Sequence, residues 1–192
     1  KELKLPAVNE KDSVKADFTV EIKDFDVCPY YSAAILENIK IKPSPDWMRR
    51  RLEVSGIRAI NNAVDITNYV LLEFGQPLHA FDKDKINGYL CVRRAENGEK
   101  LTTLDEVERT CTTDTVLIST KEGAVCAGGV FGGINSGIDE NSKNVILEGA
   151  YFTPSFNRKS ARSIGYRSEA SARYERGVDL EKVKTALFRA VE

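Results

Sequence analysis

Histidine and paired cysteines are scarce in this 192-residue sequence. It has one histidine, His79, and its four cysteines, at positions 28, 91, 111 and 126, include no C-x-x-C pair. Because zinc sites draw their ligands mainly from cysteine and histidine, no metal site is expected. Disulfide frameworks belong mostly to small secreted domains, whereas this chain is large and shows no secretory pattern. We therefore expect reduced, mostly buried thiols in a cytoplasmic protein.

The sequence also lacks a long apolar run and an excess of either charge. A membrane-spanning helix needs about 20 mostly apolar residues, so no membrane association is expected. The 28 lysines and arginines nearly balance 29 acidic residues, for a net charge of −1. Any nucleic-acid contact must therefore come from a local patch. One stretch of the sequence is basic and contains Arg158, Lys159, Arg162, Arg167, Arg173 and Arg176. These residues could contact a phosphate backbone or form a solvated charged face.

Short β-rich segments separated by turn residues predict a sheet system. Strands are expected over residues 18–22, 31–39, 90–94, 116–119, 124–127 and 145–152. Residues 1–17 are polar and unpatterned, which predicts a linker or approach segment.

Capping residues and helical spacing predict five helices. The first is expected to start at Ser44 and stop at Gly56, and the second to start at Asn62 and stop at Gly75. Three more are expected over 153–165, over 168–177 with Ser168 as its cap, and from 179 onward. Helices and strands together predict an α+β fold in which helices flank an antiparallel or mixed sheet system.

Standard catalytic motifs are absent from the sequence. Gly128 and Gly133 have the spacing of a P-loop, but Ile134 and Asn135 follow in place of Lys-Ser/Thr, which excludes a phosphate-binding loop of that type. The glycines of this segment allow two interpretations. They could form tight hairpin turns, or they could let backbone N–H groups approach a ligand as in an oxyanion hole.

Two side chains are candidates for chemistry. His79 lies in segment 75–82, which we expect to be a loop after the second helix, where it could position or deprotonate a water or form a structural hydrogen bond. Glu148 interrupts an apolar strand; it needs a partner if it faces the core, and none if it faces water. From these residues alone the sequence indicates an α+β domain with a possible small-ligand pocket.

Several ordered segments carry a family resemblance over residues 18–180, nearly the whole chain. They are residues 56–70, 73–82, 127–133, 135–137, 144–148 and 174–179. Together they resemble the third and fourth domains of bacterial phenylalanyl-tRNA synthetase beta subunits. The resemblance implies an editing domain at 18–178, followed by a helix at 179–192 that leads to the next domain. It also implies a β-sandwich-like sheet core between helices, in a three-layer arrangement.

The same resemblance implies a set of site residues. Those with expected catalytic roles are His79, Ser168 and Gly132. Those expected to bind substrate are Glu148, Arg58, Thr67, Asn68, Gly133 and Ala170. The family commonly has threonine where this chain has Ser168, so the hydroxyl is kept and the methyl is lost. No cofactor is expected here, since ATP and magnesium act elsewhere in the full enzyme.

The implied reaction is hydrolysis of tyrosine wrongly attached to the phenylalanine tRNA, with the tRNA acceptor end, the alpha subunit and other beta-subunit domains as partners. A phenylalanine pocket rejects an isostere with an added hydroxyl by only about 10²-fold, whereas a site that hydrogen-bonds that hydroxyl discriminates by about 10⁴ to 10⁵. Glu148 is the expected acceptor of the tyrosine phenol, left without a donor when phenylalanine binds. His79 is expected to position the water or the terminal adenosine. The alternative is a non-catalytic module that binds tRNA or protein, or serves as a scaffold.

Overall fold

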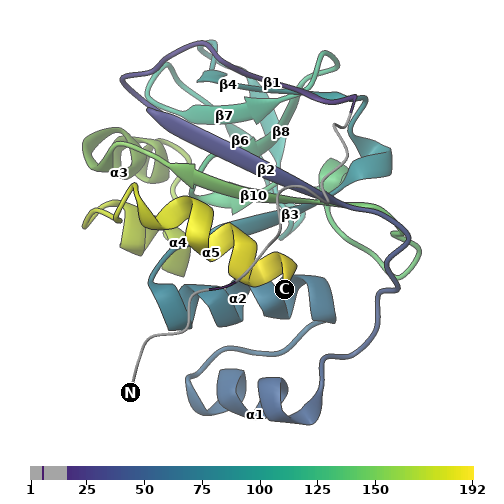
Figure 1. Ribbon diagram of the computed structural model, residues 1–192. Helices are drawn as coiled ribbons and strands as arrows, with labels where there is room; N and C mark the ends of the chain where they lie inside the picture. Colours follow the sequence, from purple (N-terminus) through teal and green to yellow (C-terminus); the bar gives the residue numbers. More distant parts are fainter. Residues whose placement is uncertain (1–5, 7–16) are drawn as a thin grey trace.

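The computed structural model describes residue 6 and residues 17–192, and it confirms an α+β fold (Figure 1). The helices are α1 (Asp46–Val54), α2 (Asn62–Phe74), α3 (Pro154–Ser163), α4 (Glu169–Tyr174) and α5 (Lys182–Val191). The strands are β1 (Thr19–Ile22), β2 (Tyr30–Leu36), β3 (Leu78–Asp82), β4 (Tyr89–Arg94), β5 (Lys100–Thr102), β6 (Glu108–Thr110), β7 (Val116–Ser119), β8 (Ala124–Ala127), β9 (Phe131–Gly132) and β10 (Val145–Tyr151). Two short 3₁₀ helices, η2 (Lys83–Lys85) and η3 (Ile134–Ser136), follow β3 and β9. The predicted linker lies outside the described residues, apart from residues 6 and 17.

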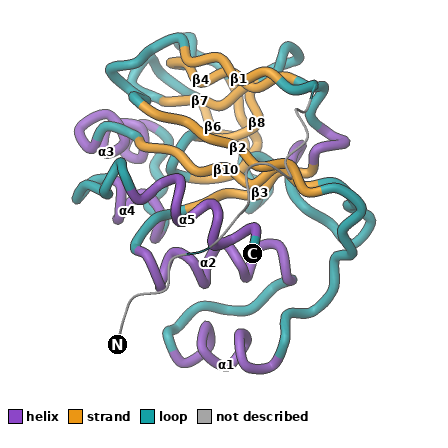
Figure 2. Tube along the Cα trace, in the orientation of Figure 1, coloured by secondary structure: helices purple, strands orange, loops and turns teal. Residues whose placement is uncertain are grey.

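The strands form three sheets. The largest has the order β1-β4-β7-β8-β9, with a parallel β1–β4 pair and antiparallel pairing elsewhere. The second is antiparallel with the order β2-β10-β3, and β5 and β6 form a separate hairpin. Figure 2 shows the strands gathered in one part of the molecule, with α2 and α5 beside the three-stranded sheet.

The two larger sheets pack face to face, which forms the expected sandwich-like core. Their shared buried cluster includes Phe81 and Ile146 from the three-stranded sheet and Leu90 and Ile118 from the five-stranded sheet. Helices α2 and α5 cover the other face of the three-stranded sheet, where Leu187 of α5 is buried in a second cluster. The helices and the two sheets thus make three layers. A third cluster joins the outer face of the five-stranded sheet to α3 and the β5–β6 hairpin.

Most strands lie where the sequence pattern predicts them, but one error affects the segment that carries His79. The predicted strands are confirmed as β1, β2, β4, β7, β8 and β10, whereas β3, β5, β6 and β9 were not predicted. The expectation of a loop around His79 is wrong, because residues 78–82 form β3. Gly75 and Pro77 gave turn signals there, but pairing with the central strand β10 holds the segment extended.

The N-caps of the first two helices each lie one residue away from the expected positions, at Pro45 and Asn61. Ser44 does not cap α1; its hydroxyl instead donates to the buried carboxylate of Asp65 at 2.6 Å. The cap of α2 is Asn61 rather than Asn62, and its side chain accepts from the backbone N–H of Val64 at 3.0 Å. The second error arises because two neighbouring asparagines have the same capping propensity. The first arises because Ser44 binds Asp65 instead of the end of α1.

The later helices lie in the predicted segments, with differences at two ends. α3 follows Thr153 with proline in its first turn, and Ser168 caps α4 in a capping box with Ser171. α4 ends at Tyr174, before the expected residue 177, and α5 begins at Lys182, after the expected start at 179. Among the described residues, no helix is long and apolar enough to cross a bilayer.

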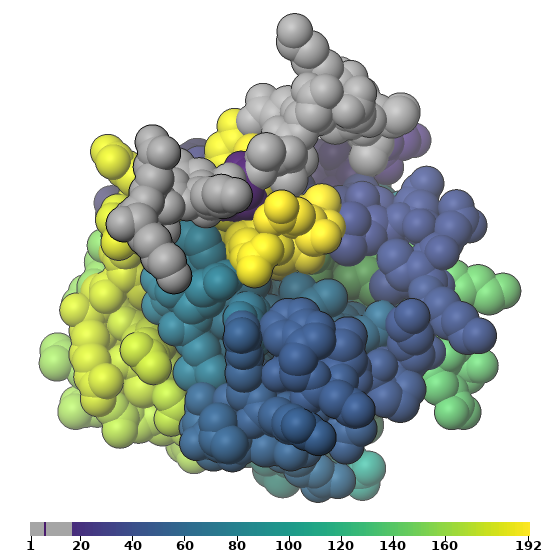
Figure 3. Space-filling view, turned by 60° about the horizontal axis from the view of Figure 1, so that its bottom comes forward, coloured from purple at the N-terminus to yellow at the C-terminus, as the bar shows by residue number. Residues whose placement is uncertain are grey.

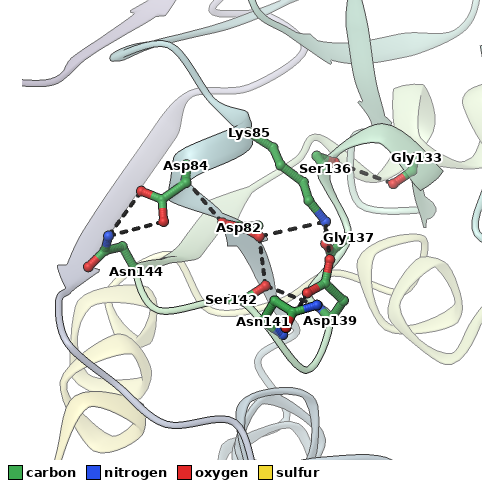
Figure 4. A network of polar contacts seen from close by, with 10 residues as sticks. All are labelled: Asp82, Asp84, Lys85, Gly133, Ser136, Gly137, Asp139, Asn141, Ser142 and Asn144. Carbon is green, nitrogen blue, oxygen red and sulfur yellow. Dashed lines mark hydrogen bonds and ion pairs between the residues drawn. The ribbon is translucent and has the colours of Figure 1, made fainter.

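A polar network fastens the loop after β9 to the end of β3 (Figure 4). The buried carboxylate of Asp82 accepts from the Ser142 hydroxyl at 2.6 Å and lies 3.6 Å from the Lys85 ammonium. Lys85 also donates to the Gly137 carbonyl at 2.8 Å and to Asp139 at 2.7 Å. The network therefore fixes the strand that carries His79 relative to the chain that follows Gly132.

Candidate functional site

A cavity of about 260 Å³ lies between α2, β3, the β8–β9 turn and the start of α4. Seven of the nine site residues implied by the resemblance line it: Thr67, Asn68, His79, Gly132, Glu148, Ser168 and Ala170. Much of the remaining wall is apolar, formed by Leu71, Pro77, Leu78, Leu104, Val130 and Phe131. The volume lies near the lower end of the range for small-molecule sites, about 300–1,000 Å³. It therefore suits one compact ligand with an apolar body.

Glu148 is buried at the centre of this site, with 3% of its surface exposed. It lies on the middle strand β10, opposite Ala33 of β2 and His79 of β3. Its Oε2 accepts a hydrogen bond from the Tyr31 hydroxyl at 2.9 Å. Its Oε1 accepts none from the part of the chain that the structure describes. The carboxylate thus has one satisfied oxygen and one oxygen available to a ligand.

This geometry corrects the expectation that Glu148 lacks any donor when its ligand has no hydroxyl. The sequence pattern does not single out Tyr31, because tyrosine is a common residue in β-strands. Burial raises the pKa of Glu148 to about 7, and the Tyr31 hydrogen bond acts in the opposite direction. Near neutral pH the carboxyl is therefore close to its titration midpoint.

His79 and Gly132 meet at the side of the cavity. A methyl group on Gly132 would lie 2.8 Å from Cε1 of the His79 ring, so the glycine makes room for the imidazole. The ring packs edge-on against Phe81 with centroids 4.5 Å apart. Neither ring nitrogen is hydrogen-bonded to any residue that the structure describes, which leaves the imidazole free to bind a ligand or water.

Burial lowers the pKa of His79 to about 4. The side chain is therefore neutral at physiological pH, with one nitrogen as donor and the other as acceptor. A general base works best when its pKa lies near the operating pH. His79 is better suited to orient a water or a hydroxyl by hydrogen bonding than to remove a proton.

Thr67 and Asn68 bring two different polar groups from α2. The Thr67 hydroxyl donates to the Val64 carbonyl at 2.7 Å, so its proton is already used within the helix and its oxygen can only accept from a ligand. The Asn68 amide has no hydrogen-bond partner among the described residues, and it lines the cavity. Asn68 is therefore the side chain of this pair that can donate a hydrogen bond to a ligand.

Ser168 and Ala170 form the wall at the start of α4. The Ser168 oxygen accepts from the backbone N–H of Ser171 at 3.0 Å, and its own backbone N–H donates to the Ser171 hydroxyl at 2.9 Å. The cap uses the oxygen as an acceptor, so the Ser168 proton can still be donated into the cavity. The Ser168 hydroxyl can thus cap α4 and also donate a hydrogen bond to a ligand.

The remaining two implied residues, Arg58 and Gly133, do not line the cavity. Arg58 is exposed in the connection between α1 and α2, in a part of the chain whose blue colour covers much of the face shown in Figure 3. The Gly133 N–H donates to the Val125 carbonyl at 2.9 Å, so it is not free to bind an oxyanion. A methyl group there would lie 2.5 Å from the same carbonyl, which explains the glycine by backbone packing.

The four cysteines are buried and reduced, as predicted. Cys126 lines the cavity, and its thiol lies 3.4 Å from the Phe131 carbonyl. Burial and the nearby charge of Glu148 raise the Cys126 pKa well above its usual value, so it remains a thiol. Within the described ranges, no group of three or more His, Cys, Asp or Glu residues is arranged to hold a metal ion.

The fold and the cavity place the chain in a known class of domain. The family model described as the B3/4 domain matches residues 27–192, and the chain belongs to this family. A solved structure, an N-terminal fragment of the phenylalanyl-tRNA synthetase beta subunit from Pyrococcus horikoshii, superposes with a TM-score of 0.54. At 19% identity over 80% of this chain and 50% of that one, it supports the fold alone.

Curated relatives narrow the resemblance to one kind of protein. The chain is 49% identical, over 93% of its length, to the phenylalanine–tRNA ligase beta subunit of Halalkalibacterium halodurans. It is 47% identical to the beta subunits of Gloeobacter violaceus, over 99% of its length, and Aquifex aeolicus, over 91%. It spans only 22 to 24% of these relatives.

Proposed function

We propose that this chain is the editing module of a phenylalanine–tRNA ligase beta subunit, and that its cavity hydrolyses the ester of tyrosyl-tRNA(Phe). The observation that carries the proposal is a set of three polar groups without protein partners in one apolar-walled cavity. They are Oε1 of Glu148, the imidazole of His79 and the amide of Asn68, and the absence of partners refers to the residues that the structure describes. The apolar wall suits an aromatic ring, and the polar groups suit its hydroxyl and its ester end.

Selection for tyrosine follows from the buried carboxylate. A phenol donates a charge-assisted hydrogen bond to Oε1 of Glu148, whereas phenylalanine leaves this desolvated oxygen unpaired. A site built in this way discriminates by about 10⁴ to 10⁵ between ligands with and without the hydroxyl. This preference is opposite to that of a synthetic site for phenylalanine, which is what removal of a mischarged tyrosine requires.

Hydrolysis needs a water held against the ester carbonyl. The neutral His79 imidazole can hold that water or a ribose hydroxyl, and Asn68 and the Ser168 proton can orient the amino acid or the ester. His79 is too weakly basic to serve as the acid or base near pH 7. The ribose hydroxyl next to the ester can assist in that role instead. Partners under this proposal are the tRNA(Phe) acceptor end, the alpha subunit and the other beta-subunit domains.

The test is deacylation of tyrosyl-tRNA(Phe) and phenylalanyl-tRNA(Phe) by the full synthetase that carries this chain, with and without Glu148→Ala. Selective loss of tyrosine with the wild type, and no selectivity with the variant, supports the proposal. If the wild type releases tyrosine no faster than buffer does, the editing function is refuted and a non-catalytic binding or scaffold role replaces it. Aminoacylation of tRNA(Phe) with phenylalanine serves as the control for an intact assembly.

A further inference from the structure

Tyr31 contacts the candidate site without lining its cavity. In the sheet register Tyr31 lies opposite Ala150 and Glu148 lies opposite Ala33, so both side chains project from the same face of the three-stranded sheet. The Tyr31 hydroxyl donates to Oε2 of Glu148 at 2.9 Å. Tyr31 itself is not among the residues that line the cavity. Its only polar contact with the site is therefore through Glu148.

We propose that Tyr31 is a positioning residue: its hydroxyl holds the Glu148 carboxylate so that Oε1 faces the cavity, ready to accept the hydroxyl of an aromatic ligand. This inference rests on the proposed function for its role in selectivity. Its structural part, a hydrogen bond that orients a buried carboxylate, stands without that function. Selectivity then depends on one carboxylate oxygen, since Tyr31 already donates to the other.

No other neighbouring group can replace Tyr31 in this role. The titratable groups that face Glu148 are Cys28, Tyr31, His79, Cys126 and Tyr174. The thiols of Cys28 and Cys126 lie against backbone carbonyls, and the Tyr174 hydroxyl lies 3.2 Å from the Pro77 carbonyl and 3.1 Å from that of Ala150. His79 is neutral and makes no hydrogen bond to Glu148 in the part of the chain described here. Among the described residues, only Tyr31 donates to the carboxylate.

Tyr31 also favours the ionised form of Glu148. Burial raises the carboxyl pKa, and the hydrogen bond from Tyr31 lowers it. Without that hydrogen bond the carboxyl is protonated over a larger part of the neutral range, and a neutral acid is a weaker acceptor for a phenol. The Tyr31 hydroxyl thus affects both the direction and the charge of the group that reads the ligand.

The first experiment compares Tyr31→Phe with Tyr30→Phe in the full synthetase. Tyr30 is the next residue on β2 and projects to the opposite face, and its hydroxyl has no hydrogen-bond partner within residues 17–192, which makes it a matched control. Tyr31→Phe should reduce the ratio of tyrosyl- to phenylalanyl-tRNA(Phe) deacylation about tenfold, as expected for one lost hydrogen bond. It should also move the pH profile of this ratio to higher pH. Tyr30→Phe should change neither.

A double-mutant cycle separates positioning from a general structural effect. In a Glu148→Ala background, Tyr31→Phe should cause no further loss of selectivity, because there is no carboxylate left to position. An equal tenfold loss in both backgrounds would overturn the inference. So would an unchanged ratio and pH profile in Tyr31→Phe alone.

The second experiment needs no editing activity. In the 192-residue chain, the side-chain carboxyl of Glu148 is titrated by ¹³C NMR, and Tyr31→Phe should raise its midpoint above that of the wild type. In the wild type the Tyr31 ring resonances should titrate with the same midpoint as Glu148, a readout that remains if Tyr31→Phe fails to fold. A Tyr31 signal that is flat through the Glu148 titration would overturn the inference. If the wild-type synthetase does not edit, the proposed function fails while this titration still decides the role of Tyr31.

Discussion

Gly132 and His79 lie so close together that the glycine has no room for a side chain. A Cβ at position 132 would lie 2.8 Å from Cε1 and 3.1 Å from Nε2 of the imidazole. The ring also packs edge-on against Phe81. The position of His79 is therefore set by packing, because neither of its nitrogens is hydrogen-bonded to a described residue.

We predict that Gly132→Ala displaces His79 and impairs the site. Overpacking of this kind destabilises a protein by about 1–3 kcal/mol, and editing should fall together with stability. The control is Gly132→Ala in a His79→Ala background, where the main obstruction is gone and the penalty should shrink. Denaturant unfolding of the four proteins measures this coupling. Equal destabilisation in both backgrounds would contradict the packing account.

The pKa of Glu148 predicts a pH-dependent stability. Its pKa in the folded state is about 7 against an ordinary value of 4.5 for glutamate, so the folded state favours the protonated acid. The resulting stabilisation is present below about pH 4.5 and is lost as pH rises through 7. It amounts to on the order of 3 kcal/mol. Glu148→Gln should therefore be more stable than the wild type at pH 8 and gain little at pH 4, as measured by denaturant unfolding at both pH values. A pH-independent difference would refute the assignment.

Substitutions at Ser168 test how much its capping hydrogen bond stabilises the chain. Ser168→Ala removes the oxygen that accepts from the Ser171 N–H and should destabilise the chain by about 1 kcal/mol. Ser168→Thr keeps the cap and should leave the free energy of unfolding nearly unchanged. If alanine is as stable as serine and threonine, the capping box does not stabilise α4.

Asp82 is predicted to be the most sensitive residue of the network in Figure 4. It is buried and accepts hydrogen bonds from the Ser142 hydroxyl and from the backbone N–H of Asp84. Asp82→Ala leaves these donors unpaired and should cost about 1–3 kcal/mol. Asp84→Ala, at an exposed position next to it, is the control and should change stability much less. Similar losses for both variants would show that burial does not govern this network.

The sequence predicted the strands that form most of the sandwich, since β7 and β8 are continuous apolar segments bounded by turn residues. It could not orient Glu148. The residues on both sides of this acid are apolar or small, so alternation does not distinguish the two faces of β10. The partners that settle the orientation, Tyr31 and His79, lie far away in sequence and meet Glu148 only through the register of the three-stranded sheet.

Residues of one motif do not all line the cavity. Arg58 lies within the longest family-like segment, yet it is exposed and does not line the cavity. Gly133 adjoins Gly132, yet only Gly132 lines the cavity, since the N–H of Gly133 pairs with Val125. Two residues that adjoin in one motif can therefore have different structural roles, and only the folded structure distinguishes these roles.

The most direct test of the central claim is a substrate series that changes only the donor read by Glu148. The full synthetase is given tRNA(Phe) charged with tyrosine, with phenylalanine or with 4-fluorophenylalanine, in which fluorine replaces the hydroxyl and cannot donate a hydrogen bond. We predict that tyrosine is released at least about 10² times faster than either analogue, and that Glu148→Ala abolishes the difference. Release of the fluorinated amino acid as fast as tyrosine would show that the cavity senses bulk and not the hydroxyl, and would contradict the account.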